Sequence, residues 1–275
     1  MWSSPKNNSD FANMNQELTA NVLLEVCVGS VTDARAAEAG GAGRIELCGA
    51  LELGGLTPSL GLIEQAVAAV DLPVMAMIRP RAGGFCYSEA EFHCMMRDAE
   101  LAMKAGAQGI VFGVLNENSC VDAARTEQLV NSAGSGESVF HRAFDFVSNP
   151  LESLDTLIEL GINRVLTTGG AATAAEGIES LSHLAKHAAG RIQIMPGGNV
   201  SVENIAKLVA AINCKQVHTG SVVSSVDLSL TREATASLCD LPRLKNGEFR
   251  TVDKTRVSKL KAALCNEFQS RESDF

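Results

Sequence analysis

The sequence has little of what nucleic-acid-binding and membrane proteins need. It holds 23 basic against 32 acidic residues, for a formal net charge of −9, and only 4% aromatic residues, with one Trp and one Tyr. It therefore lacks the basic stripe and the stacking aromatics of a nucleic-acid interface. No apolar run approaches the roughly 18 residues that cross a bilayer. We expect neither a nucleic-acid partner nor a membrane partner.

The start of the chain and its cysteines argue against a secreted, disulfide-bonded protein. The opening MWSSPKNNSDFANMNQE has no basic start followed by an apolar stretch. Residues 1–20 are predicted to be a disordered tail, and residues 21–275 a single domain. The eight cysteines are scattered and include no Cys-x-x-Cys pair. We expect reduced thiols in a soluble intracellular protein.

The sequence alternates short apolar runs with amphipathic stretches. At 275 residues and 46% hydrophobic content, the chain can bury one large core. Several of the amphipathic stretches open with Ser, Thr or Asn, as helices do. Eight strands alternating with helices predict an α/β fold, a single (β/α)8 TIM barrel. The eight strand-like runs are LLEVCV, RIELC, PVMAMIRP, GIVFGVL, SVFHRAFD, RVLTTGG, IQIMPGG and QVHTGS.

The pattern becomes irregular after the last strand-like run. The segment VVSSVDLSLTREATASLCDLPRLKNGEFR is polar and mixed, and a helical stripe returns only in DKTRVSKLKAALCNEF. That stripe consists of Val257, Leu260, Leu264 and Phe268. We therefore predict that the last helical segment of the barrel is irregular, either delayed or displaced.

Strand alternation predicts which side chains face the lumen of the barrel. In LLEVCV the alternate residues Leu24, Val26 and Val28 suit the helix layer, which leaves Glu25 and Cys27 facing inward. In RIELC the same reasoning turns Glu46 and Cys48 inward.

Strand alternation turns further polar residues toward the lumen, at or near the carboxyl ends of the strands, where TIM barrels have their active sites. Arg79, His141 and His218 are predicted to face the lumen, with Arg142 and Asp145 near the end of the fifth strand. Charged groups in a lumen must be paired. The cluster fits either a catalytic site or a structural network in which Arg79 neutralises Glu25 and Glu46.

The two inward cysteines fall on neighbouring strands. Strands in a barrel lie about 5 Å apart, so Cys27 and Cys48 are close enough to share a soft metal ion. Two thiols without a third Cys disfavour a four-cysteine zinc site or an iron–sulfur cluster and leave Cu(I) as the natural metal. Free Cys is also an ordinary small buried residue, and this second reading stays open.

An enzyme is the alternative function. The loops MPGGNVS and HTGS follow the last two strands, where barrels often bind phosphate, and offer Gly197, Gly198, Ser201 and Gly220 as an anion site. Turn geometry explains a Gly pair equally well. In an enzyme, His141 or a Glu would move a proton and Arg79 would hold the anion of a small phosphorylated or carboxylated metabolite. The candidate catalytic set is Glu25, Glu46, Arg79, His141, Arg142, Asp145 and His218.

The order and spacing of the motifs resemble the CutC family of copper homeostasis proteins. LLEVCV, RIELC followed by GGLTPS, MIRPR, GIVFGVL, VFHRAFD, RVLTTGG and MPGG carry the resemblance, from about residue 22 to residue 221. It implies a TIM barrel, a homo-oligomer (dimer or tetramer), a location in the cytoplasm with the nucleus as a second site, and Cu(I) bound by Cys27 and Cys48. The sequence departs from the family pattern at Gly29, at RPRAGGF around Gly84, and at MPGGNV.

Overall fold

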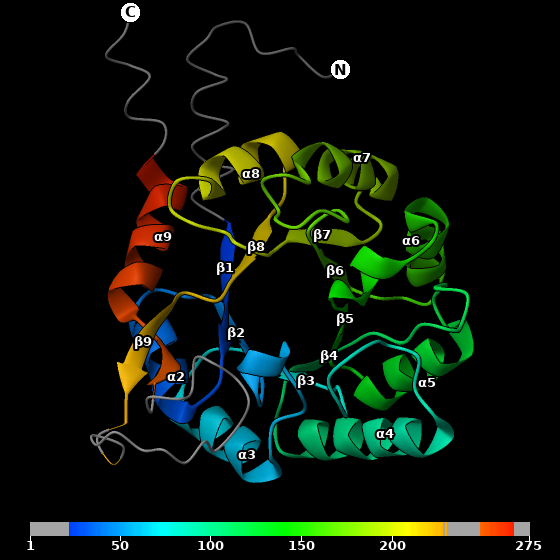
Figure 1. Cartoon of the computed structure of the whole chain (residues 1–275), viewed down its shortest axis with the longest axis horizontal. Helices are drawn as coiled ribbons and strands as arrows, with labels where there is room; N and C mark the ends of the chain where they lie inside the picture. The colour runs from blue at the N-terminus through cyan, green and yellow to red at the C-terminus, as the bar shows by residue number, and fades with distance from the viewer. Residues whose placement is uncertain (1–21, 228, 230–247, 267–275) are drawn as a thin grey trace, which may run out of the picture.

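The computed structural model describes residues 22–227, 229 and 248–266. Eight parallel strands form a nearly closed barrel whose order is β7-β6-β5-β4-β3-β2-β1-β8, and this confirms the predicted fold (Figure 1). β7 and β8 end this order and contact each other. The predicted tail, residues 1–20, and Phe268 lie outside the described residues. The strands are β1 (Leu23–Val28), β2 (Arg44–Leu47), β3 (Val74–Met77), β4 (Gly109–Phe112), β5 (Glu137–Phe140), β6 (Arg164–Thr167), β7 (Gln193–Pro196) and β8 (Gln216–Thr219).

Helices surround the strands, as Figure 1 shows. Several begin with the side-chain caps that the sequence offers: Ser59 accepts from the backbone N–H of Leu62, and Ser88 with Glu91 forms a capping box. Short 3-10 turns η1 (Leu51–Leu53) and η2 (Arg142–Phe146) follow β2 and β5. The helices are α2 (Val31–Ala39), α3 (Leu60–Ala69), α4 (Glu89–Lys104), α5 (Ala123–Ala133), α6 (Pro150–Glu159), α7 (Ile178–Ala188), α8 (Ile205–Ile212) and α9 (Lys254–Asn266).

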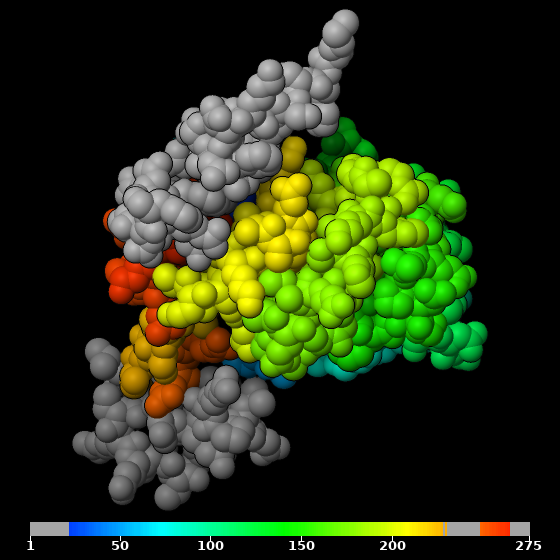
Figure 2. Space-filling model, turned by 90° about the horizontal axis from the view of Figure 1, so that it is seen from above, coloured from blue at the N-terminus to red at the C-terminus, as the bar shows by residue number. Residues whose placement is uncertain are grey.

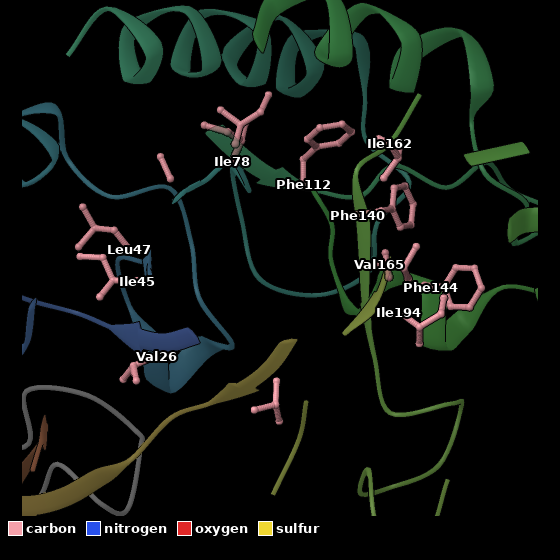
Figure 3. Packing of buried hydrophobic residues seen from close by; sticks show 14 of the residues in the cluster. Val26, Ile45, Leu47, Ile78, Phe112, Phe140, Phe144, Ile162, Val165 and Ile194 are labelled. Carbon is pink, nitrogen blue, oxygen red and sulfur yellow. The ribbon is translucent and has the colours of Figure 1, made fainter. Parts of the chain in front are cut away.

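Strand alternation divides the buried residues into two layers. Val26, Ile45, Ile78, Phe112 and Phe140 are fully buried between strands and helices and belong to one hydrophobic cluster, part of which Figure 3 shows. The residues between them on the same strands face the lumen. The predicted orientations are thus confirmed for the first three strands, with lumen packing provided by Cys48, Met75, Met77, Val111, Val139, Leu166 and Met195.

A hairpin delays the last helix, as the irregular sequence predicted. After β8 the chain forms β9 (Val222–Val226), which pairs antiparallel with β10 (Glu248–Val252), and only then α9. α9 packs against both α8 and α2 and completes the ring of helices. Figure 2 shows the orange and red residues of this C-terminal segment beside the yellow residues of α8.

One buried carboxylate fastens the C-terminal hairpin to the start of the barrel. Asp33 of α2 accepts hydrogen bonds from the backbone N–H of Val252 at 2.7 Å and from the Thr251 hydroxyl at 2.7 Å. Its other oxygen accepts from the backbone N–H of Gly29 at 3.2 Å. Nearby, Gly40 lies so close to Val257 of α9 that a Cβ at this glycine would stand 2.5 Å from the Cβ of Val257. The first and last helices of the ring therefore pack in direct contact.

Candidate functional site

A cavity of about 710 Å³ opens at the carboxyl ends of the strands. Its walls come from the strand ends, from the loops that follow them, and from the C-terminal hairpin and α9. Several predicted site residues line it: Cys27, Glu46, Cys48, Arg79, His141, Arg142, Gly198, Ser201, His218 and Gly220. Glu25, Asp145 and Gly197 are not among its lining residues.

The two thiols lie together at the base of the cavity. Cys27 belongs to β1, and Cys48 follows β2, where its backbone N–H donates to the carbonyl of Val28 at 2.9 Å. This parallel register brings the two Sγ atoms to 3.8 Å, within hydrogen-bond distance of each other. Cys48 is 1% exposed, whereas Cys27 is only partly buried. The predicted proximity of the two cysteines is confirmed.

The surroundings of the pair make its two thiols unequal. The hydrogen bond between the two thiols, together with His218, outweighs burial and lowers the pKa of Cys27 to about 5. The same bond and burial raise the pKa of Cys48 above its usual range. Cys27 is therefore the thiol of the pair that ionises first, and it is a thiolate at neutral pH. A thiolate is the form that binds metals and attacks electrophiles.

A charged network lies below the thiols in the lumen. Glu25 pairs with Arg44, and its Oε1 lies 2.8 Å from Nδ1 of His218. Burial opposes ionisation of Glu25, but His218 and Arg44 outweigh it and lower the pKa of Glu25 to about 2. Burial likewise opposes a charge on His218, while Glu46 and Glu25 raise its pKa well above the usual value. His218 is thus an imidazolium held between two carboxyl groups.

Glu46 connects this network to the thiols. Its Oε2 lies 3.8 Å from Nε2 of His218 and 3.5 Å from Sγ of Cys48. Burial, with the nearby Cys27 thiolate and Glu25, raises the pKa of Glu46 well above its usual value. Its Oε1 is buried without a hydrogen-bond partner among the described residues. Within that part of the chain, two sets of donor atoms lie within 4.8 Å of one another: Cys27 with Glu46 and Cys48, and Glu25 with Glu46 and His218.

The prediction that Arg79 neutralises Glu25 and Glu46 is wrong. The Nη1 of Arg79 donates to the carbonyls of Gly54 and Gly55 at 3.2 Å each, and Nη2 donates to that of Gly83 at 2.8 Å. The guanidinium therefore holds two loops at the mouth. Arg44 pairs with Glu25 instead, and Glu46 lies beside His218. The sequence signal for Arg44 was its position two residues before Glu46, on the same side of β2.

His141 is held as a neutral imidazole. Its Nδ1 accepts from the backbone N–H of Ala143 at 3.2 Å, and its ring packs on Phe85 with centroids 5.1 Å apart. Gly113 leaves room for this ring, since a Cβ there would stand 2.5 Å from it. Burial, and then the charge of Arg79, lower the pKa of His141 to about 3. Because Nδ1 is an acceptor, the proton of the neutral ring is on Nε2, which has no partner among the described residues.

Asp145 and Arg142 have separate roles at the end of β5. Asp145 accepts from the Thr167 hydroxyl and from the backbone N–H groups of Thr168 and Gly170, at 3.0 and 3.2 Å for the latter two. It therefore organises the loop after β6. Arg142 donates from Nε to Asp145 at 2.8 Å and lines the cavity.

The glycines after β7 are explained by packing. A Cβ at Gly197 would stand 2.5 Å from Leu166 and 3.1 Å from His218. Gly198 has φ +100°, and a Cβ there would stand 2.6 Å from Thr168. Gly220 has no such neighbour within 4 Å. Three cavity residues that we did not predict, Arg250, Arg256 and Lys259, come from the C-terminal hairpin and α9.

These features define a TIM-barrel protein with a thiol pair and titratable groups at the mouth of its barrel. The model of the CutC family matches residues 22–223. The chain belongs to the CutC family, whose curated relatives include copper homeostasis proteins.

Similarity to known proteins extends over most of the chain. A CutC family protein of Treponema denticola is 48% identical over 198 residues, covering 72% of this chain and 80% of the relative. The copper homeostasis protein cutC homolog of Mus musculus is 40% identical over 242 residues, covering 87% of this chain and 88% of the relative. The crystal structure of CutC from Streptococcus agalactiae, at 34% identity, superposes with a TM-score of 0.69 and covers 72% of this chain and 98% of that one. Within the described residues, no helix has the length and apolar character to cross a bilayer.

Proposed function

We propose that this protein takes part in copper homeostasis by binding one Cu(I) ion between Cys27 and Cys48, as an intracellular copper buffer or carrier. The observation that carries the proposal is the 3.8 Å separation of the two Sγ atoms on adjacent strands. Thiolates are soft ligands that select Cu(I), and Cys27 is already a thiolate at neutral pH. Relatives named for copper homeostasis support the same assignment.

The separation of the sulfurs fits a bridging metal ion. Cys27 and Cys48 would hold the ion through their Sγ atoms, which lie 3.8 Å apart on adjacent strands. Their thiolates would supply the soft ligands that Cu(I) prefers. Glu46 offers a carboxylate oxygen within 4.8 Å of both sulfurs, and its Oε2 lies 3.5 Å from Sγ of Cys48. The thioether of Met77 belongs to the same lumen cluster and helps to keep the site apolar.

The thiol pair also bears on where the protein works in the cell. Reduced thiols require a reducing compartment, so we place the protein in the cytoplasm, with the nucleus as a second location. By its resemblance to the family we also propose a homo-oligomer, a dimer or a tetramer. Neither point affects the chemistry of the thiol pair, which lies within one chain.

Anaerobic competition titration with Cu(I) tests the site directly. The reduced protein is expected to bind one copper per chain, and Cys27→Ser and Cys48→Ser are each expected to weaken binding about 100-fold or more. Loss of a ligand should exceed the roughly 10–100-fold effect of losing a residue that only orients one. Cys94→Ser is the matched control, because Cys94 is exposed on α4, outside the cavity. Tight binding that persists in both site variants, with unfolding curves showing an intact fold, would refute the proposal.

A further inference from the structure

The cavity is far larger than a copper site needs. At about 710 Å³ it falls in the range of about 300–1,000 Å³ that is typical of small-molecule pockets. The thiol pair occupies only its base. The upper walls come from Phe85, from the loop after β7, and from the C-terminal hairpin and α9. The space above the sulfurs is therefore large enough for a small molecule in addition to a metal ion.

The charges on its walls are mostly positive, although the protein as a whole is acidic. The formal net charge of the chain is −9. Within the described part of the chain, the acidic residues that line the cavity are Glu46 and Glu203. The basic side chains that line it are those of Arg79, Arg142, Arg250, Arg256 and Lys259. Such a wall attracts anions.

Two of the basic groups have no side-chain partner in the part of the chain that the structure describes. Within the described residues, Arg250 and Lys259 make neither an ion pair nor a side-chain hydrogen bond, and both are exposed at the mouth. Arg256 uses Nη1 for the carbonyl of Val222 at 2.7 Å and retains its other donors. Arg250 comes from β10, and Arg256 and Lys259 come from α9. We call these three side chains the cationic wall, and the delayed C-terminal segment supplies it.

A second, independent observation points to an oxygen-bearing ligand. His141 is 4% exposed and lines the cavity, yet its Nε2 has no hydrogen-bond partner in the described part of the chain. Nε of Arg79, which also lines the cavity, is likewise buried without a partner. A buried donor without a partner is costly, and a ligand oxygen would satisfy it.

We propose that this cavity binds a small organic anion. Its carboxylate or phosphate group lies among Arg250, Arg256 and Lys259, and a carbonyl or hydroxyl oxygen of its body accepts from Nε2–H of His141. In this arrangement His141 is a hydrogen-bond donor, because its Nδ1 is occupied by the backbone N–H of Ala143. The site stands above the thiol pair and does not depend on copper.

Calorimetric titration of the reduced, copper-free protein tests the proposal. The probes are inorganic phosphate and pyruvate, which has a carboxylate beside a carbonyl oxygen. Saturable binding of at least one probe is expected. It should weaken about tenfold or more in the Arg250→Ser/Lys259→Ser double variant, since each charge-assisted contact contributes on that scale. His141→Gln should weaken pyruvate more than phosphate. Preference for one probe assigns the anionic group as phosphate or carboxylate.

Two comparisons make the test decisive. The double variant Arg35→Ser/Lys207→Ser removes the same charge from exposed positions on α2 and α8, outside the cavity, and should bind as the unmodified protein does. Equal weakening in both double variants, or no saturable binding of either probe, would overturn the proposal. Anion binding is titrated without copper, and copper binding without the anion probes, so that failure of the anion site and failure of the copper site are separate results.

Discussion

Acidification tests the environment of His141 directly. His141 is 4% exposed, and burial together with Arg79 lowers its pKa to about 3, against about 6.5 for a histidine in an unfolded chain. Between these two values the unfolded state binds a proton that the folded state does not. The free energy of unfolding therefore rises with pH across this window. The contribution of His141 to it is complete above pH 6.5 and is lost as the pH falls toward 3.

The size of the effect follows from the same two values. A pH of 5 is about 1.5 units below the pKa of the imidazole in the unfolded chain, so protonation stabilises the unfolded state by about 2 kcal/mol. Urea unfolding followed by far-ultraviolet circular dichroism at pH 7, 6 and 5 measures the loss. In His141→Gln the drop between pH 7 and pH 5 should be smaller by about 2 kcal/mol, whatever the stability of this variant at pH 7.

The control is a histidine that the fold leaves in water. His93 is exposed on α4, so His93→Gln controls for the loss of an imidazole outside the cavity. Identical pH dependence in His141→Gln and the unmodified protein would contradict the lowered pKa of His141. A resonance of the His141 ring that titrates near pH 6.5 would refute it as well.

Two further predictions concern packing and charge. Glu25→Gln leaves the buried guanidinium of Arg44 without its counter-charge and should lower the free energy of unfolding by about 3–5 kcal/mol in urea titrations; a loss below about 1 kcal/mol would contradict the buried pair. Gly40→Ala should destabilise the protein by about 1–3 kcal/mol, because its Cβ would press on Val257. Gly61→Ala, inside α3 with nothing within 4 Å of a Cβ, should instead stabilise it by up to about 1 kcal/mol, and equal melting temperatures for the two variants would argue against the packing of α9 on α2.

Side-chain direction was predictable from the sequence, because a strand has a period of two. Once Leu24 and Val26 are assigned to the helix layer, Glu25 and Cys27 must face the lumen, and the structure places them there. The proximity of Cys27 to Cys48 followed from the adjacency of consecutive strands. These inferences depend only on local geometry and chain order.

Pairing within the lumen was not predictable in the same way. Several inward residues compete for each charge, and the choice depends on their height along the barrel axis. Arg44 is directly opposite Glu25 in the β1–β2 register. Arg79 lies nearer the mouth of the barrel, where its guanidinium donates hydrogen bonds to the carbonyls of Gly55 and Gly83. Arg250 was missed because β9 and β10 are short and only partly buried, so their sequence carries no strong hydrophobic period. Arg256 and Lys259 lie on α9, a helix that the sequence predicts, but the sequence does not show that this helix borders the mouth.

The hydrogen bonds that Asp33 accepts from the C-terminal hairpin join residues 218 and 219 positions apart in the chain. During synthesis, Asp33 leaves the ribosome long before Thr251 and Val252 exist. At about 5–20 residues per second, the buried carboxylate waits on the order of ten seconds or more for its partners. Until they arrive, α9 cannot cover the gap between α8 and α2, and the mouth of the barrel lacks its cationic wall. The cavity is therefore completed only after residues 248–266 have been synthesised, and a nascent chain that already contains both thiols does not yet have a finished site around them.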